Sequence, residues 1–378
     1  MNILMISEDH SLANFGITKV VSQLCDELAL HYSDARTIIL STSQEVVQQN
    51  HKVAIETTHP VGLGKFWKWS PDLATRLTNI IYRYKIDIIH IHGIWMAAQW
   101  AGISIARKQK IPLVISAHGM FQPWLWKEQG RTKWIKKKIY YSLFLKPLVP
   151  PHAIFHALSQ KEAYTLEQFF PGQSKVIIPN AITLKSSEKT KNQIIEKKFL
   201  FLGRIHPIKA VDILVQAFSN ANLGDDWRLC IVGPDDVPDY AENIKKVIEG
   251  LDLTDRVELL GPVYGENKLL HFTDSWALIL PSYSEGFPMV SLEAAQCSLP
   301  TILTIEAGLE NWTDSGGLLV KPDVDDIAIK LVEASNWSLD QRRERGERSF
   351  NYVKENYSWE VIIPAWYELY ERMTRSSS

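Results

Sequence analysis

The sequence predicts an α/β protein made of two doubly wound domains. Short apolar runs typical of buried strands alternate with amphipathic helical stretches along most of the chain. This alternation stops in the polar, lysine-rich stretch 184–198, which has the composition of a linker, and then starts again. The length of 378 residues also exceeds that of a typical single domain. Two similar halves imply a cleft between them, with ligands bound outside the carboxyl ends of the strands.

The first predicted domain covers residues 1–183. Its expected strands are Asn2–Ile6, Thr37–Ser41, Ile86–Ile91, Leu113–Ala117, Ala153–Ala157 and Lys175–Ile178, with helices such as Lys19–His31 and Leu73–Tyr84. The uncharged stretch 88–106 approaches the length of a membrane span. Because His90, His92 and Gly93 interrupt it, we expect a buried strand, a loop and a helix instead.

The second predicted domain covers residues 199–356. Its expected strands are Phe199–Gly203, Arg228–Val232, Val257–Leu260, Ala277–Leu280, Thr301–Thr304 and Gly317–Val320. Helices are expected near Ala210–Asn220, Tyr240–Gly250, Asn267–Asp274, Val290–Ala295 and Val324–Glu333.

Composition narrows the class of protein. The formal net charge is −2, so the whole molecule has no field that would attract nucleic acid. Cys25, Cys230 and Cys297 lie far apart among apolar neighbours, which favours reduced core thiols over a disulfide framework or a zinc site. The first residues form an apolar run of strand length without the features of a signal peptide. These features predict a cytoplasmic protein.

The most informative segment joins a strand to a helix at residues 281–293. Gly286 permits a tight turn, and Pro288 suits the start of a helix because it has no amide hydrogen to satisfy. The amides of Met289 and Val290 should then point outward at the positive end of the helix dipole, where a diphosphate binds well. Two carboxylates, Glu285 and Glu293, bracket the turn. The pattern predicts a nucleotide-sugar site.

The frame P-S-x-x-E-G-F-P-x-x-x-x-E-A resembles the donor motif of the retaining glycosyltransferases of family 4, which have the GT-B fold of two Rossmann-like domains facing each other across a cleft. By this resemblance Glu285 contacts the transferred sugar, and Glu293 bonds the ribose hydroxyls. The same resemblance implies that a final helix, within residues 357–373, crosses back onto the first domain and forms part of the hinge.

A second motif opens the second domain and places two cations after a strand. An enzyme without a metal needs fixed positive groups where negative charge develops on the leaving phosphate, and Arg204 and Lys209 fit this role. Their spacing is similar to the family signature G-R-x-x-x-x-K-G, which places Gly203 in the donor site. Ala210 stands where the family has glycine, so the backbone there should be less permissive.

The first domain offers weaker candidates. His118 follows an expected strand and resembles the family's histidine near the donor sugar; we expect it to position substrate rather than transfer a proton. The segment Asn14-Phe15-Gly16 resembles the family's glycine loop, which makes Gly16 a candidate contact to the diphosphate or the acceptor. Asn180 matches a hinge element only in part and is assigned a structural role.

We expect no cofactor and no metal. Asp323-Val-Asp325 spells the D-x-D of metal-dependent glycosyltransferases of another fold. It follows a proline and precedes an apolar helical stretch, so we interpret it as the acidic cap of a helix.

A basic, aromatic tract raises the question of a membrane. Its cations include Lys133, Lys136, Lys137 and Lys138, with Trp134 among them. Helices in the interface of an anionic membrane have this composition, and so does a solvated helix whose aromatic residues enter the core. Both interpretations stay open. Under the first one, these five residues are candidates for contact with the membrane or with the acceptor.

Taken together, the sequence predicts a retaining, metal-independent hexosyltransferase. The expected donor is a UDP- or GDP-linked sugar, and the acceptor is a hydroxyl of a glycan or lipid-linked glycan in cell-surface polysaccharide, lipopolysaccharide or glycolipid synthesis. The expected location is cytoplasmic, with peripheral attachment to the inner face of the plasma membrane. A sugar-nucleotide epimerase, a glycan phosphorylase, or a non-catalytic nucleotide-sugar-binding or membrane adaptor protein are the alternatives.

Overall fold

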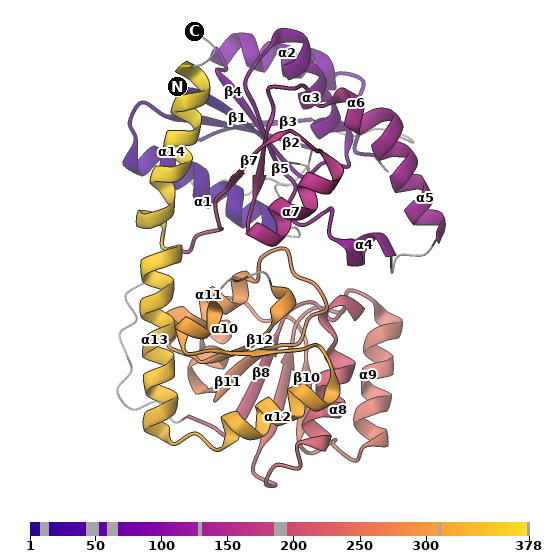
Figure 1. The fold of residues 1–378 in the computed structure, drawn as a ribbon, viewed down its shortest axis with the longest axis vertical. Coiled ribbons are helices and arrows are strands. Elements are labelled where there is room, and N and C mark those ends of the chain that lie inside the picture. The colour runs from indigo at the N-terminus through magenta and orange to yellow at the C-terminus, as the bar shows by residue number, and fades with distance from the viewer. Residues whose placement is uncertain are drawn as a thin grey trace. The chain divides into compact units, whose positions relative to one another are not determined.

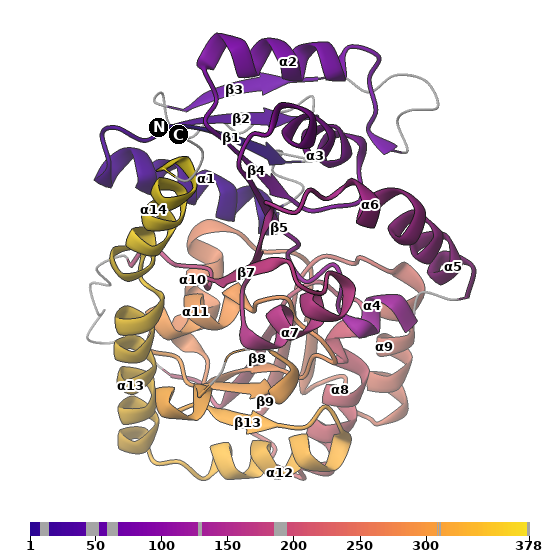
Figure 2. The same ribbon diagram turned by 45° about the horizontal axis from the view of Figure 1, so that its top comes forward.

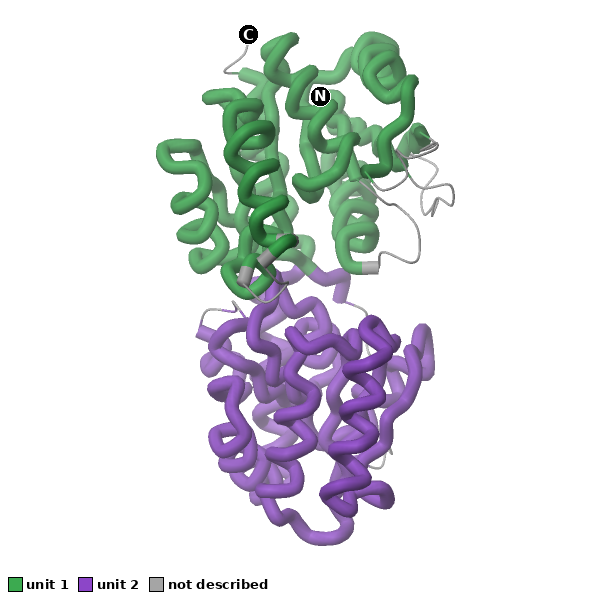
Figure 3. The backbone as a smooth tube through the Cα atoms, turned by 90° about the vertical axis from the view of Figure 1, so that its right-hand side faces the viewer, with its two compact units in different colours: residues 1–181, 359–378 green, residues 182–358 purple. Residues whose placement is uncertain are grey.

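The computed structural model describes residues 1–7, 15–42, 53–58, 67–127, 131–184, 195–307, 309 and 311–375. The chain forms two compact units, residues 1–181 with 359–378 and residues 182–358 (Figure 3). Most of the expected linker, residues 185–194, lies outside the described ranges. Its last residue, Lys198, begins the first strand of unit 2. Its side chain can be buried because Glu196 and Asp274 pair with its ammonium group.

Unit 1 is an α/β unit around a parallel sheet. Its elements are β1 (Asn2–Ser7), α1 (Phe15–His31), β2 (Arg36–Ser41), β3 (Ala54–Thr57), α2 (Leu73–Tyr84), β4 (Ile88–His92), α3 (Ala97–Gln109), β5 (Leu113–Ser116), α4 (Pro123–Lys127), α5 (Arg131–Tyr140), the π-helix η3 (Tyr141–Leu145), α6 (Lys146–Leu148), β6 (Ile154–Ala157), α7 (Gln160–Phe169), β7 (Ser174–Ile177) and α14 (Trp359–Arg375) (Figure 1).

Alternation along the strands of unit 1 builds two apolar layers. Leu4 and Ile6 of β1 pack with α2 and α3, whereas Ile3 and Met5 pack with α1 and α14. The described strands follow the order β3-β2-β1-β4-β5-β6-β7 and all pair in parallel. The C-terminal helix α14 is therefore part of unit 1, although the whole of unit 2 precedes it in the sequence.

Unit 2 repeats this plan. Its elements are β8 (Lys198–Leu202), the 3-10 turn η4 (Pro207–Lys209), α8 (Val211–Asn220), β9 (Arg228–Val232), α9 (Pro238–Gly250), β10 (Val257–Leu260), α10 (Gly265–Asp274), β11 (Ala277–Leu280), α11 (Met289–Gln296), β12 (Thr301–Thr304), η5 (Ile305–Ala307), η6 (Trp312–Ser315), β13 (Leu318–Val320), α12 (Val324–Ser335) and α13 (Leu339–Tyr357) (Figure 2). The described strands run in the order β10-β9-β8-β11-β12-β13, again in parallel.

The predicted α/β class is confirmed, and the expected strands lie within one or two residues of the observed ones. The stretch 88–106 forms the predicted strand, loop and helix. None of the helices in the described ranges is both long and apolar enough to cross a bilayer. The three cysteines are free thiols, and burial raises the pKa of each to about 12.

The elements that the sequence did not predict include a strand and a long helix. Strand β3 lies at the edge of its sheet, and its four residues are all partly exposed, so it has no apolar signal. Helix α13 was missed because its buried face carries small and polar residues. A Cβ atom on Gly346, for example, would lie 2.0 Å from the carbonyl oxygen of Ser298, so the helix approaches this backbone too closely for a larger residue.

Candidate active site

The two motifs of the second domain meet where the strand order of unit 2 reverses. Strands β8 and β11 are hydrogen-bonded neighbours in the middle of the sheet. Their carboxyl ends therefore lie side by side, at the position where open α/β sheets bind ligands. The loop after β8 carries Arg204 and Lys209, and the loop after β11 carries Glu285.

A buried ion pair joins these two loops. The ammonium Nζ of Lys209 donates to Oε1 of Glu285 at 2.5 Å, and the Ser282 hydroxyl donates to the same oxygen at 2.7 Å. The side chains of Lys209 and Glu285 are only 17% and 9% exposed. A backbone bond from Tyr283 N–H to Ile208 C=O, 2.9 Å, reinforces the contact. The pair therefore fixes one cation and one carboxylate at the strand ends.

The turn that presents Lys209 has its own local support. Nδ1 of His206 accepts the amide of Ile208 at 3.1 Å, which caps the short turn η4. Ala210 then adopts φ 53°, the left-handed conformation that glycine takes without strain. The departure from the family glycine therefore does not prevent the turn, but it costs about 1 kcal/mol of strain.

Arg204 is held more loosely than Lys209. Its Nη1 contacts Oδ2 of Asp236 at 2.6 Å, and the two side chains are 59% and 36% exposed. Ion pairs as exposed as this one contribute little, so Arg204 can exchange Asp236 for another anion. Burial lowers the pKa of His206, and the charges of Arg204 and Lys209 lower it further. Neither Asp236 nor His206 was predicted from the sequence, because an aspartate or a histidine after a strand is not a specific signal.

Gly203 has a structural role in the sheet. Its amide donates to Val232 C=O at 3.0 Å, so that amide is already bonded within the sheet. A Cβ on Gly233, which has φ 155°, would lie 1.8 Å from the carbonyl oxygen of Gly203. Gly233 therefore lets the ends of β8 and β9 approach closely.

The turn into α11 differs in detail from the prediction. The helix begins at Met289 with Pro288 at its N-cap, and the Met289 amide donates to Phe287 C=O at 3.0 Å. The expectation that this amide points outward is therefore wrong. Val290 lies in the first turn, as expected.

Glu293 lies about one turn into α11, which begins at Met289. Its Oε2 accepts the ammonium group of Lys268, on α10, at 2.7 Å. The side chains of Glu293 and Lys268 are 16% and 28% exposed. Lys268 is a further cation of this site that the sequence motif did not include.

His118 lies in a sharp turn after β5. It has φ 50°, and the following Gly119 has φ 75°. Glu162 holds this turn, because its buried carboxylate accepts the Gly119 amide at 2.6 Å and the Leu158 amide at 2.8 Å. Nε2 of His118 lies 3.0 Å from Nδ1 of His92, and burial lowers the pKa of His118 to about 3. A neutral imidazole fits the predicted positioning role better than acid catalysis.

Four histidines, His90, His92, His118 and His156, gather at this edge of the unit 1 sheet, and we call them the histidine cluster. Ser116 Oγ lies 2.7 Å from both His90 Nε2 and His156 Nδ1. The Tyr370 hydroxyl of α14 lies 2.7 Å from His90 Nδ1, so the cluster ties α14 to the sheet. Burial lowers the pKa of His156 to about 4 and that of His90 well below its ordinary value. The spacing of these histidines along the chain did not predict the cluster.

The remaining candidates are distributed over unit 1. Gly16 is exposed in the first turn of α1 rather than in a loop, and Asn14 lies outside the described ranges. Trp134, Lys136, Lys137 and Lys138 belong to α5, as does Lys133, whose side chain is not described.

Acidic groups elsewhere have ordinary structural explanations. Asp323 is the N-cap of α12 and accepts the Asp326 amide at 2.9 Å, which confirms the capping interpretation. Over the described part of the chain, no group of three or more His, Cys, Asp or Glu side chains is arranged to hold a metal ion.

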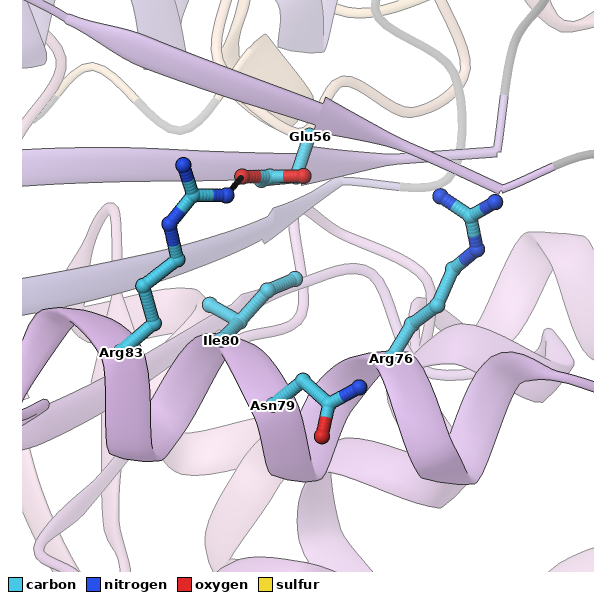
Figure 4. Close-up of a pocket in the computed structure, with 5 residues that line it drawn as sticks. All are labelled: Glu56, Arg76, Asn79, Ile80 and Arg83. Carbon is cyan, nitrogen blue, oxygen red and sulfur yellow. Dashed lines mark hydrogen bonds and ion pairs between the residues drawn. The ribbon is translucent and has the colours of Figure 1, made fainter.

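A cavity of about 350 Å³ opens on unit 1 between α2 and β3. Figure 4 shows Arg76 and Arg83 rising from α2 on either side of it, with Glu56 facing them from β3. Arg83 pairs with Glu56 at 3.4 Å, and Arg76 pairs with Asp72. None of the residues that line this cavity belongs to the motifs identified in the sequence, so we assign no part of the candidate site to it.

Two protein families match the chain, one for each half. The family described as Glycosyltransferase Family 4 matches residues 16–186, and the family described as Glycosyl transferases group 1 matches residues 184–351. An N-acetyl-α-D-glucosaminyl L-malate synthase of Bacillus anthracis is 25% identical over 318 residues, 80% of this chain and 79% of that protein. An exopolysaccharide phosphotransferase of Streptomyces coelicolor is 34% identical over 212 residues, which are 52% of this chain but only 20% of that protein.

Solved structures match over the whole chain. A sucrose-phosphate synthase of Thermosynechococcus elongatus has a TM-score of 0.78 at 19% identity and covers 100% of both chains. The Anabaena protein HepE, solved with UDP and glucose, has a TM-score of 0.75 at 16% identity, with 98% of this chain and 100% of that chain covered. At such identities the likeness concerns the fold, which is GT-B. With both halves matched in sequence and the fold matched throughout, the chain belongs to the family 4 glycosyltransferases.

Proposed function

We propose that this glycosyltransferase moves a hexose from a UDP- or GDP-linked donor to an acceptor hydroxyl, with retention of anomeric configuration. The observation that carries the proposal is the buried ion pair between Lys209 and Glu285 at the reversal point of the unit 2 sheet. It places a fixed positive charge and an oriented carboxylate where open α/β sheets bind nucleotides. Unit 2 then holds the donor, and unit 1 holds the acceptor.

The cations of the site have different tasks in this proposal. Lys209 is fixed and stabilises charge on the departing diphosphate. Arg204 is exposed and weakly paired, so it leaves Asp236 for a phosphate oxygen when the donor binds. The amide of Val290 and the dipole of α11 add to the phosphate site, and Glu293 bonds the ribose.

Positive side chains replace a metal ion in this mechanism, and no cofactor is required. Departure and attack occur on the same face of the sugar, with the leaving diphosphate helping to deprotonate the acceptor. A double displacement would instead need a carboxylate free to attack the anomeric carbon. Glu285 is poorly suited to that role because Lys209 and Ser282 both bond it at Oε1.

The acceptor that we propose is a hydroxyl of a growing or lipid-linked surface glycan, in polysaccharide, lipopolysaccharide or glycolipid synthesis. The reaction would then take place on the cytoplasmic side, at the inner face of the plasma membrane. One relative has a name in this area, the exopolysaccharide phosphotransferase of Streptomyces coelicolor.

A panel of nucleotides and nucleotide sugars tests the donor assignment. A ligand that binds only the folded protein raises its melting temperature, so UDP or GDP sugars should shift it and adenine nucleotides should not. Glu293→Ala should weaken nucleotide binding by about 1–3 kcal/mol because the ribose hydroxyls lose their partner. Glu285→Ala should lower turnover more than nucleotide affinity.

Transfer should also continue in EDTA. Loss of transfer in EDTA with recovery in manganese would overturn the metal-free site. Wild-type binding and turnover in both glutamate variants would remove the donor loop from the mechanism.

A further inference from the structure

An unusually exposed set of apolar side chains lies along the helical segment formed by α5 and η3. Ile135 is 47% exposed, Ile139 is 50%, Leu143 is 66% and Phe144 is 55%. We call these four residues the apolar ridge. Single exposed apolar side chains are common on protein surfaces, but a continuous row of them marks an interaction site.

The helix geometry explains why the ridge is continuous. Ile135 and Ile139 are four residues apart and therefore lie on one face of α5. The wider turns of the π-helix η3 rotate the chain less per residue, which keeps Leu143 in line with Ile139. On the other side of the segment, Leu145 is fully buried and the Tyr141 ring packs against Phe169. The segment is thus anchored by one face and exposes the apolar side chains of the other.

The segment also extends outward from its own unit. Figures 1 and 2 agree that α5 extends away from the unit 1 sheet, beyond the helices that cover it. Its packing partners include α4 and η3. The ridge therefore contributes little to the core of unit 1.

Positive charge accompanies the ridge. Helix α5 carries five cations and no acidic residue, in a chain whose net charge is −2. Lys136 and Lys138 are exposed, and the Lys138 ammonium group lies 4.8 Å from the centre of the Trp134 ring. Lys137 differs from the sequence expectation, because its Nζ turns inward, 5.7 Å from the Trp95 ring centre and 3.5 Å from Leu125 C=O.

We propose that the apolar ridge inserts into the headgroup region of an anionic lipid membrane, with Lys136 and Lys138 on the lipid phosphates. A helix with aliphatic and aromatic residues on one face and lysines at its borders lies in the plane of such an interface. The ridge residues provide the insertion, and the lysines provide the attraction to the lipid phosphates. This inference goes beyond the transfer reaction and does not depend on which sugar is moved.

The charge distribution favours lipid over a second copy of the chain. A symmetric dimer through the ridge would bring the cations of two α5 helices together, which is unfavourable for unscreened like charges. An anionic bilayer instead provides an apolar layer and negative headgroups in the same surface.

Vesicle sedimentation of the full-length protein tests the proposal. The parent protein should bind vesicles of phosphatidylcholine with phosphatidylglycerol at least tenfold more tightly than vesicles of phosphatidylcholine alone. The triple variant Ile135→Gln, Ile139→Gln, Leu143→Gln should lose at least tenfold of this binding. The variant Lys136→Gln, Lys138→Gln should weaken it severalfold, and added salt should have a similar effect on the parent.

A matched control separates the ridge from general hydrophobicity. Leu269, Leu270 and Ile329 of unit 2 are 51%, 54% and 61% exposed, so their replacement by Gln removes a comparable amount of exposed apolar surface. This control should bind vesicles like the parent. Nucleotide binding should be unchanged in every variant, which distinguishes failure of this proposal from failure of the donor assignment.

Three results would overturn the proposal. They are absence of vesicle binding in the parent, unchanged binding in the ridge variant, and a parent dimer that the ridge variant converts to a monomer. The last result would assign the ridge to a second copy of the chain.

Discussion

Removing the cation of the buried ion pair should damage stability and catalysis in separable ways. Lys209→Met leaves the Glu285 carboxylate buried without its ammonium partner, while the Ser282 hydroxyl still donates to Oε1. Breaking a fully buried pair costs about 3–5 kcal/mol. Because the two side chains are 17% and 9% exposed, we expect about 2–3 kcal/mol here. For a unit of this size, that loss lowers the melting temperature by about 4–10 °C.

The double variant Lys209→Met, Glu285→Gln provides the sharp comparison. This variant removes both charges of the pair. Its free energy of unfolding should therefore return to within about 1 kcal/mol of the parent value. Turnover should stay roughly a hundredfold or more below the parent, because the positive charge that stabilises the transition state is still missing. Recovery of stability without recovery of activity is therefore the expected signature.

Hydrogen exchange of amides in β8 and β11 measures the stability of unit 2 separately from unit 1. Lys330→Met is the matched control, since Lys330 and Glu333 form an exposed pair on α12 whose loss should cost less than about 1 kcal/mol. If Lys209→Met were as stable as the control, or the double variant no more stable than the single one, the argument from a buried pair would be refuted.

Three further outcomes are expected. Asp236→Asn removes the carboxylate that competes for Arg204 and should tighten UDP or GDP binding up to about fivefold in calorimetry, by about 1 kcal/mol; weaker binding would contradict this. Glu162→Gln can no longer accept the Gly119 and Leu158 amides together, and should lower turnover with nucleotide affinity unchanged, unlike Glu167→Gln at the exposed glutamate of α7. Burial lowers the pKa of folded His118 to about 3, below its unfolded value near 6.5, so unfolding takes up a proton between these values. As the pH falls from about 6.5 to 3, the free energy of unfolding should therefore fall by about 1.4 kcal/mol per pH unit. Melting curves of His118→Asn should show a shallower fall over this range; an unchanged slope would exclude a neutral buried imidazole.

Much of the fold was predictable because the apolar periodicity of each unit is regular. Strands β9 to β12 match the predicted bounds residue for residue, since each is a fully or largely apolar run between turn residues. Helix α13 could not be found in the same way. Its buried face includes Arg342, which donates to the carbonyls of Ser275 and Trp276, and no periodicity of apolar residues reveals a buried guanidinium group.

The two motifs of the candidate site were predictable from the sequence, but the contact between them was not. Arg204, Lys209 and Glu285 were chosen from local spacing, and that spacing does not say which strands are neighbours. The pairing of β8 with β11 brings Lys209 to Glu285 across 76 residues of sequence. Two further residues complete these contacts, since Asp236 pairs with Arg204 and Lys268 pairs with Glu293. Neither Asp236 nor Lys268 belongs to a motif that the sequence could reveal.

The ion pairs suggest how the charges of the candidate site are held. Arg204, Lys209 and Lys268 each contact a carboxylate, so no strong local field is left over from these three pairs. An incoming diphosphate must replace one of those carboxylates. The most exposed pair is that of Arg204, and it is therefore the one that gives way at the lowest cost. On this argument Arg204 senses the arrival of the donor, while the more buried Lys209 keeps its place for the transition state.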